Sequence, residues 1–186
     1  MKETLYTLTV HSENIAGVLN QITTIFTRRQ LNIESLNVSA SALEGIHKYT
    51  ITTYSDEATI KKVTKQIEKI IDVLQADYFT DNEIFYREVA LYKIPTQEFV
   101  DSNSIENLIS KHNARIIEIN DTYTVIQKAG TTEETANLYY DLDKIGILQF
   151  VRSGRIAITK SPVEKLNNYL AYRKEQYEDL KNKNGK

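Results

Sequence analysis

The segment Asn14-Ile15-Ala16-Gly17 places a polar amide and a glycine just before apolar residues at helical spacing. A helix N-terminus exposes backbone N–H groups and carries a partial positive charge, which makes it a natural site for a carboxylate. A glycine there allows a small ligand to approach the backbone without a Cβ in the way. This segment is therefore the candidate for ligand binding.

Two roles are open to Asn14. As the helix N-cap, its side-chain oxygen would accept a hydrogen bond from the backbone N–H of Ala16 or Gly17. As a ligand contact, its amide would bind a carboxylate and its carbonyl an ammonium group. The residues alone favour the cap, because asparagine is common at that position. The cap leaves Gly17 unexplained, since a glycine inside a helix costs about 1 kcal/mol relative to alanine.

Signatures of catalysis are missing elsewhere in the sequence. The 186 residues include no cysteine, which excludes disulfides, thiolate nucleophiles and cysteine-based zinc sites and fits a reducing cytosol. There is no nucleophile elbow, phosphate loop or H-E-x-x-H motif. The histidines are far apart, and we predict His47 and His112 on the surface and His11 at a loop edge. We expect no catalytic residue and no metal site in this chain.

Charge and hydropathy argue against two classes of partner. The net charge of -2 offers nothing for nucleic-acid phosphates, and the strand His47–Tyr54 lacks the glycine and basic residues of an RNA-binding sheet. No apolar run approaches the roughly 20 residues of a membrane-spanning helix. The first residues lack the apolar core of a signal peptide. We predict a cytoplasmic protein without nucleic-acid or membrane partners.

Apolar periodicity predicts the elements that position the Asn14–Gly17 segment. Strand-like and helix-like periods alternate and predict a strand at Leu5–Val10, a helix from Val18, strands at Leu31–Val38 and Ile46–Tyr54, a helix capped within Ser55–Glu57, and a strand at Val73–Phe79. This β-α-β-β-α-β order is the ferredoxin-like plan, with one antiparallel sheet and both helices on one face.

The same order recurs in the second half of the chain. The predicted elements are a strand at Phe85–Ile94, a helix at Ser104–Lys111, strands at Ala114–Ile119 and Tyr123–Lys128, a helix at Thr131–Asp143 and a strand at Ile147–Val151. We therefore predict an α+β protein with two ferredoxin-like βαββαβ domains, at residues 1–80 and 83–160. A helical extension at 161–186 begins with the N-cap signature Ser161-Pro162-Val163-Glu164. It either packs on the second domain or docks on a partner.

Several segments are similar to one known family. The pattern N-x-x-G-x-L (Asn14, Gly17, Leu19), followed by a helix and by N-I-E-S-L (Asn32–Leu36), resembles the amino-acid-binding ACT domain of the regulatory small subunit of acetohydroxyacid synthase, or acetolactate synthase. Later segments resemble that family's second domain, in order: R-E-V-A-L-Y-K-I (Arg87–Ile94), R-I-I-E-I (Arg115–Ile119), T-V-I-Q-K-A-G-T (Thr124–Thr131) and V-R-S-G (Val151–Gly154). The resemblance implies an N-terminal ACT domain and a C-terminal ACT-like domain.

The resemblance implies a regulatory subunit with no active site of its own. Such a subunit forms a homodimer through its ACT domain and binds the catalytic large subunit, which condenses two 2-keto acids. It activates that subunit and confers feedback inhibition by valine on branched-chain amino acid biosynthesis, including that of isoleucine. Thiamine diphosphate, Mg and FAD are expected on the catalytic partner, and no cofactor is expected in this chain.

The resemblance also implies which residues bind valine. The ligand would lie between the loop of one ACT domain and the N-I-E-S-L region of its partner. The matching positions are Asn14, Ile15, Ala16, Gly17 and Val18 in the loop, and Asn32, Ile33, Glu34, Ser35, Leu36 and Val38 in the second segment. Ile33, Leu36 and Val38 equally fit an ordinary strand core.

Two other functions stay open from the sequence. The chain could be a stand-alone amino-acid sensor built from ACT repeats, without a thiamine-dependent partner. It could also be a small enzyme on the ferredoxin-like plan, although it offers no evident nucleophile or acid/base pair.

Overall fold

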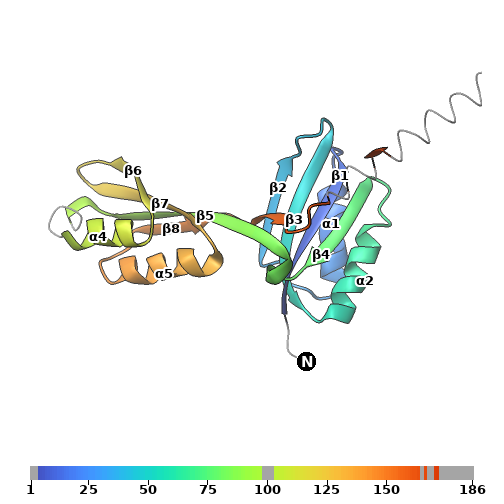
Figure 1. Cartoon of the computed structure of the whole chain (residues 1–186), viewed down its shortest axis with the longest axis horizontal. Helices are drawn as coiled ribbons and strands as arrows, with labels where there is room; N and C mark the ends of the chain where they lie inside the picture. Colours follow the sequence, from blue (N-terminus) through green and yellow to red (C-terminus); the bar gives the residue numbers. More distant parts are fainter. Residues whose placement is uncertain (1–3, 98–102, 164–165, 167–169, 172–186) are drawn as a thin grey trace, which may run out of the picture. The chain divides into compact units, whose positions relative to one another are not determined.

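The computed structural model describes residues 4–97, 103–163, 166, 170 and 171. The chain divides into two compact units (Figure 1). The first unit contains the described residues up to Phe85, without Ser35–Asn37, and the described residues from Ile158 onward. The second unit contains Tyr86–Ala157 together with Ser35–Asn37.

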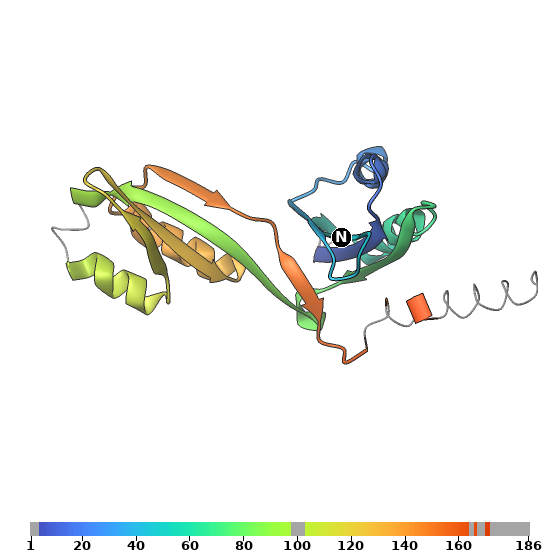
Figure 2. The same ribbon diagram turned by 90° about the horizontal axis from the view of Figure 1, so that it is seen from above.

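The first unit is built on a four-stranded antiparallel sheet. This sheet and the elements around it are β1 (Thr4–Glu13), α1 (Val18–Arg28), β2 (Ser35–Ala40), β3 (Ile46–Ser55), α2 (Glu57–Ile67), β4 (Val73–Phe79) and the 3-10 turn η1 (Asp81–Glu83). The first three residues of β2 also contact the second unit closely enough to be grouped with it. The strand order is β2-β3-β1-β4, and β1 pairs with β3 from Thr4 opposite Ser55 to Glu13 opposite Ile46. Figures 1 and 2 show α1 and α2 on the same side of this sheet.

Apolar stripes attach both helices to the sheet. The residues that α1 buries are Val18, Ile22 and Phe26, and those that α2 buries include Ile60, Val63 and Ile67. These positions recur at three and four residues, so each helix turns one face to the core. Asp56 begins α2 as the N-cap, and its Oδ1 accepts the backbone N–H of Thr59 at 2.9 Å. The hydroxyl and backbone N–H groups of Thr59 lower the pKa of Asp56. The predicted cap within Ser55–Glu57 is confirmed.

The second unit repeats the plan. Its elements are β5 (Ile84–Pro95), α4 (Asn103–Lys111), β6 (Arg115–Ile119), β7 (Tyr123–Gly130), α5 (Thr132–Asp143), β8 (Gln149–Arg152) and β9 (Ile156–Thr159). The strand order is β6-β7-β5-β8, and β9 also pairs with β5. The core consists of Ala90, Tyr92, Ile94, Ile126, Leu138 and Leu142. Both sheets have the order that the ferredoxin-like plan requires, so the predicted fold class is confirmed.

Some sequence-based predictions need correction. The second strand begins at Ser35 and not at Leu31, because Asn32–Glu34 form an irregular approach to the sheet. There the Oγ1 of Thr53 donates to the carbonyl of Asn32 at 2.6 Å. Strand β9 has only four residues and escaped prediction.

The histidines also differ from their predicted positions. His11 is buried within β1 and is not at a loop edge, and His47 is half-buried. The side chain of His112 is only 12% exposed, and its Nε2 lies 3.0 Å from Oδ2 of Asp141.

The C-terminal extension is described only in part. The Oγ of Ser161 accepts the backbone N–H of Val163 at 3.2 Å, and Leu166 is buried. Residues 164–165, 167–169 and 172–186 lie outside the described part, so the extended helix stays a prediction. Among the described helices, none combines the length and the apolar character needed to cross a membrane.

Candidate functional site

The segment Asn14–Gly17 connects β1 to α1. The helix begins at Val18, and its N-cap is Gly17, with φ 94° and ψ -15°. This left-handed conformation is open to glycine at little cost, because glycine has no Cβ. A Cβ at Gly17 would meet no atom within 4 Å. The backbone conformation, and not close packing, therefore accounts for the glycine.

The N-cap prediction for Asn14 is wrong. The cap of α1 makes no side-chain hydrogen bond, and the first turn of the helix carries no acidic residue. Asn14 lies before the turn that Gly17 ends, and its backbone N–H donates to the carbonyl of Gly45 at 2.8 Å. Within the described structure the N-terminus of α1 thus presents its first N–H groups without a side-chain acceptor. This arrangement suits an external carboxylate.

The loop residues are open to solvent. Asn14, Ala16 and Gly17 are exposed, and Ile15 is 47% exposed. Val18 is buried in the core of the first unit, so its side chain anchors the helix, and only its backbone can contribute to a ligand site. The loop therefore combines free donors with one exposed apolar side chain.

The N-I-E-S-L segment leads into β2, which lies at the edge of the first sheet. Asn32, Glu34 and Val38 are exposed, and Ile33, Ser35 and Leu36 are half-buried. None of these six residues is in the fully buried core, although three of them had equally fitted it. An edge strand offers backbone donors and acceptors to a further strand.

The loop and Glu34, which begins the second half of the predicted site, lie toward opposite ends of this sheet. Asn14 hydrogen bonds to Gly45, beside the pair Glu13–Ile46, whereas the N–H of Glu34 donates to the carbonyl of Thr52 at 2.8 Å. From Ile46 to Thr52 the strand advances by six residue steps, which is about 20 Å at about 3.4 Å per residue. One chain therefore does not bring the loop and Glu34 to one small ligand.

A polar cluster in the second unit was missed by the sequence analysis. Glu88 on β5 is 4% exposed. Its Oε1 accepts the hydroxyl of Thr135 at 2.6 Å and lies 3.4 Å from Nη1 of Arg152. Strand alternation was the available signal, since Glu88 shares a face with the core residues Ala90 and Tyr92.

A second ionic cluster joins the ends of α4 and α5. Oδ2 of Asp141 lies 3.0 Å from Nε2 of His112 and 3.2 Å from Nζ of Lys111, and its Oδ1 lies 3.0 Å from Nζ of Lys144. Hydrogen bonds from His112 first, then from Lys144 and Lys111, hold the pKa of Asp141 well below its usual range. The two lysines are exposed, and the cluster links two helix ends, which indicates a structural role.

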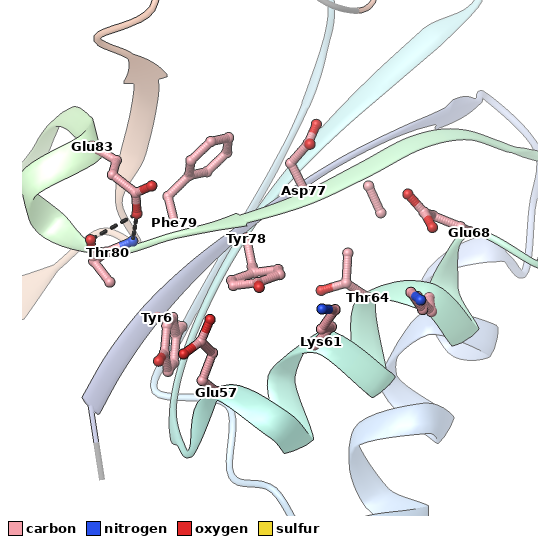
Figure 3. Close-up of a pocket in the computed structure, with 12 residues that line it drawn as sticks. Tyr6, Glu57, Lys61, Thr64, Glu68, Asp77, Tyr78, Phe79, Thr80 and Glu83 are labelled. Atoms are coloured by element: carbon pink, nitrogen blue, oxygen red, sulfur yellow. Dashed lines mark hydrogen bonds between the residues drawn. The ribbon is translucent and has the colours of Figure 1, made fainter. Parts of the chain in front are cut away.

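A hollow of about 540 Å³ lies beside α2 and β4 (Figure 3). The rings of Tyr6 and Tyr78 meet edge to face there, with centroids 5.8 Å apart. Burial, and next the charge of Glu57, raises the pKa of Tyr6. The backbone N–H and hydroxyl of Thr80 both donate to Glu83 at 2.8 Å and lower the pKa of Glu83. No residue of the predicted ligand site lines this hollow.

Comparison with known proteins covers most of the chain. A family model described as the AHAS small subunit-like ACT domain matches residues 8–75, and one described as the small subunit of acetolactate synthase matches residues 87–161. The acetolactate synthase small subunit of Buchnera aphidicola is 31% identical over 155 residues, which cover 83% of this chain and 97% of that relative. The chain belongs to the acetolactate synthase small-subunit family.

Other members of the family agree with this assignment. The acetolactate synthase small subunit of Bacillus subtilis is 31% identical over 165 residues, covering 88% of this chain and 94% of that protein. A crystal structure of the acetolactate synthase small subunit from Thermotoga maritima superposes with a TM-score of 0.77 at 24% identity, covering 86% of this chain and 99% of that one. The structure from Thermotoga maritima supports the fold, and the sequence matches confirm the resemblance.

Proposed function

We propose that this chain is a regulatory subunit of acetolactate synthase that binds the catalytic large subunit, activates it and makes it sensitive to valine. Family membership supports the regulatory role. One observation carries the ligand site: the loop Asn14–Gly17 and Glu34 of the N-I-E-S-L segment lie at levels about 20 Å apart along the sheet of one chain, with β2 at the sheet edge. Thiamine diphosphate, Mg and FAD would belong to the catalytic partner.

A two-fold axis at the β2 edge would unite the two halves. The loop lies at the level of Gly45, near the end of β2, whereas Glu34 lies at its start. Two copies of β2 paired antiparallel about a two-fold axis run in opposite directions. The start of one β2 then lies beside the end of the other, so each loop faces the N-I-E-S-L segment of the second copy. The dimer would hold two equivalent sites.

Valine fits the groups that would meet in each site. Its carboxylate would accept the free N–H groups at the start of α1, where no acidic side chain competes. The side-chain carbonyl of Asn14 would accept the ammonium group. Its isopropyl group would contact the exposed side chains of Ile15 and, from the other protomer, Val38.

Regulation would follow from a shift between arrangements of the paired ACT domains. A ligand moves such an equilibrium only by its differential affinity for the two states. Valine bound across the β2 edges contacts both protomers, so it favours the arrangement in which loop and segment approach each other. The catalytic subunit would then respond to the population of that arrangement.

The direct experiment mixes the full chain with the catalytic large subunit. We expect higher acetolactate formation with the chain than without it, and a decrease on addition of valine. The same mixture with Asn14→Ala should keep the activation and need about tenfold more valine for inhibition, as expected for one lost hydrogen bond to a charged group. Absence of activation would contradict the regulatory role. The stand-alone sensor alternative predicts that result.

A further inference from the structure

The turn Arg152–Arg155 between β8 and β9 is held by residues from distant parts of the chain. The N–H of Ser153 donates to the carbonyl of Val89 at 2.8 Å, and the N–H of Val89 donates to the Oγ of Ser153 at 2.9 Å. Arg152 faces the buried carboxylate of Glu88 at 3.4 Å. Two consecutive residues of the turn are therefore fixed to β5.

Arg155 fixes the other side of the turn to α5. It is 4% exposed, and its Nη2 donates to the Oγ1 of Thr132 at 3.2 Å. The same hydroxyl donates to Oε2 of Glu88 at 3.2 Å. The guanidinium of Arg155 also lies 3.8 Å from the ring centroid of Tyr86. Because the groups of a buried polar network restrain one another, the turn is a rigid piece of the second unit.

Gly154, which is half-buried, brings the backbone of this turn against Leu36 and Asn37 of β2. A Cβ at Gly154 would lie 2.9 Å from the carbonyl oxygen of Leu36 and 3.2 Å from the backbone N of Asn37. Leu36 and Asn37 belong to the same compact unit as the turn. The atoms that a Cβ would meet are backbone atoms, which cannot rotate away as a side-chain end can. The close approach of these backbone atoms therefore requires glycine at position 154.

We infer that Gly154 is a positioning residue for the ligand segment: the turn, held by Glu88, sets the backbone of Leu36 and Asn37 and thereby the affinity for the amino acid. This inference rests on the proposed ligand site. Leu36 is one of its predicted residues, and Ser35 and Glu34 precede it on the same strand approach. A change at the turn reaches the ligand through β2 without touching the loop Asn14–Gly17.

The test measures valine binding by calorimetry on the full chain with Gly154→Ala. We expect about tenfold weaker binding, because the added methyl group must displace the carbonyl of Leu36. Gly130→Ala is the matched control in the same unit. Its Cβ would meet side-chain atoms of Glu134 and Lys128, and we expect affinity within about twofold of the parent.

Amide hydrogen exchange separates positioning from general loss of stability. In Gly154→Ala without ligand, peptides that cover Leu36–Val38 should exchange faster, while those that cover Asn14–Gly17 should keep the parental rate. Faster exchange in both regions, or in neither, would contradict the inference.

Glu88→Gln provides a variant without an added atom. It keeps the acceptor for Thr135 and removes the charge that faces Arg152, so we expect valine binding weakened by about threefold. If Gly154→Ala does not fold, valine binding by Glu88→Gln tests the inference in its place. Parental affinity in every folded variant would overturn the inference. Absence of valine, leucine and isoleucine binding by the parent would instead contradict the proposed site, and the exchange measurement would still test the contact.

Discussion

The backbone N–H of Asn14 donates to the carbonyl of Gly45, 2.8 Å away, and this bond attaches the loop of the proposed ligand site to the connection between β2 and β3. The loop is therefore fixed at the end of the sheet where β2 finishes. Glu34 is bonded to Thr52 toward the other end. From this relationship it follows that the proposed ligand site needs two copies of the chain.

Substitutions of Gly17 should affect the stability of the fold and the affinity for valine separately. Its φ of 94° disfavours most L residues, so Gly17→Ala should lower the free energy of unfolding by about 1 kcal/mol in urea titrations. Asparagine tolerates this conformation, so Gly17→Asn should be close to the parent in stability. Both variants should bind valine at least tenfold more weakly by calorimetry, because each adds a Cβ where the ligand approaches. Tight valine binding by Gly17→Asn would place the ligand elsewhere.

Val38→Lys should weaken the dimer. Val38 is 38% exposed on the edge strand, and an edge lysine opposes strand pairing between copies. Sedimentation velocity should show mainly monomers at concentrations where we expect the parent to be dimeric, and calorimetry should show a parallel loss of valine sites. Val163→Lys is the matched control, since Val163 is 54% exposed and lies outside both sheets. A dimeric Val38→Lys variant would show that the copies associate through another surface.

Tyr92→Phe should destabilise the second unit. The hydroxyl of Tyr92 is buried and donates to the carbonyl of Thr135 at 2.6 Å, and burial raises its pKa. Removing the hydroxyl leaves that carbonyl without its buried donor, which should lower the free energy of unfolding by about 1–2 kcal/mol. Tyr140→Phe alters an exposed tyrosine on α5, the helix that carries Thr135, and should change the free energy of unfolding by less than about 0.5 kcal/mol. Equal effects of the two substitutions would contradict this account.

Asp141→Asn should remove a pH-dependent part of the stability. The pKa of Asp141 is depressed in the folded chain by His112, Lys144 and Lys111, so its ionised form stabilises the fold above the unfolded pKa of about 3.9. That stabilisation is lost as pH falls from about 4 toward the lower folded value. Urea titrations should therefore show parent and variant differing at pH 6 and converging as the pH falls below about 4. A difference that stays constant over this range would exclude the proposed ionic contribution.

The sequence predicted the order of strands and helices because local apolar periodicity determines it. Apolar residues recur at helical spacing in both helices of the first unit, as Ile22 and Phe26 do in α1 and Val63 and Ile67 in α2. This spacing can be recognised within each segment alone, without knowing which distant residues it contacts. The sequence also predicted part of the α5 capping box, in which Thr131 and Glu134 satisfy each other's backbone N–H groups.

Long-range geometry decided what the sequence could not predict. Asparagine preference favoured Asn14 as a cap, but the left-handed Gly17 starts the helix later. Glu88 appeared as one carboxylate among many, because its partners Thr135 and Arg152 lie 47 and 64 residues further along the chain. The contact of Gly154 with Leu36 joins segments that are still further apart.

The most direct test of the two-chain ligand site mixes two defective variants. Gly17→Asp adds a negative charge to the loop, and Ile33→Asp adds one to the N-I-E-S-L segment, so neither should bind valine alone. After exchange of protomers, half of the dimers are mixed and each holds one site with two parental halves. Calorimetry of the mixture should then recover about a quarter of the parental valine sites at parental affinity. No recovered site, with dimers mixed as shown by native mass spectrometry, would contradict a ligand site shared between two chains.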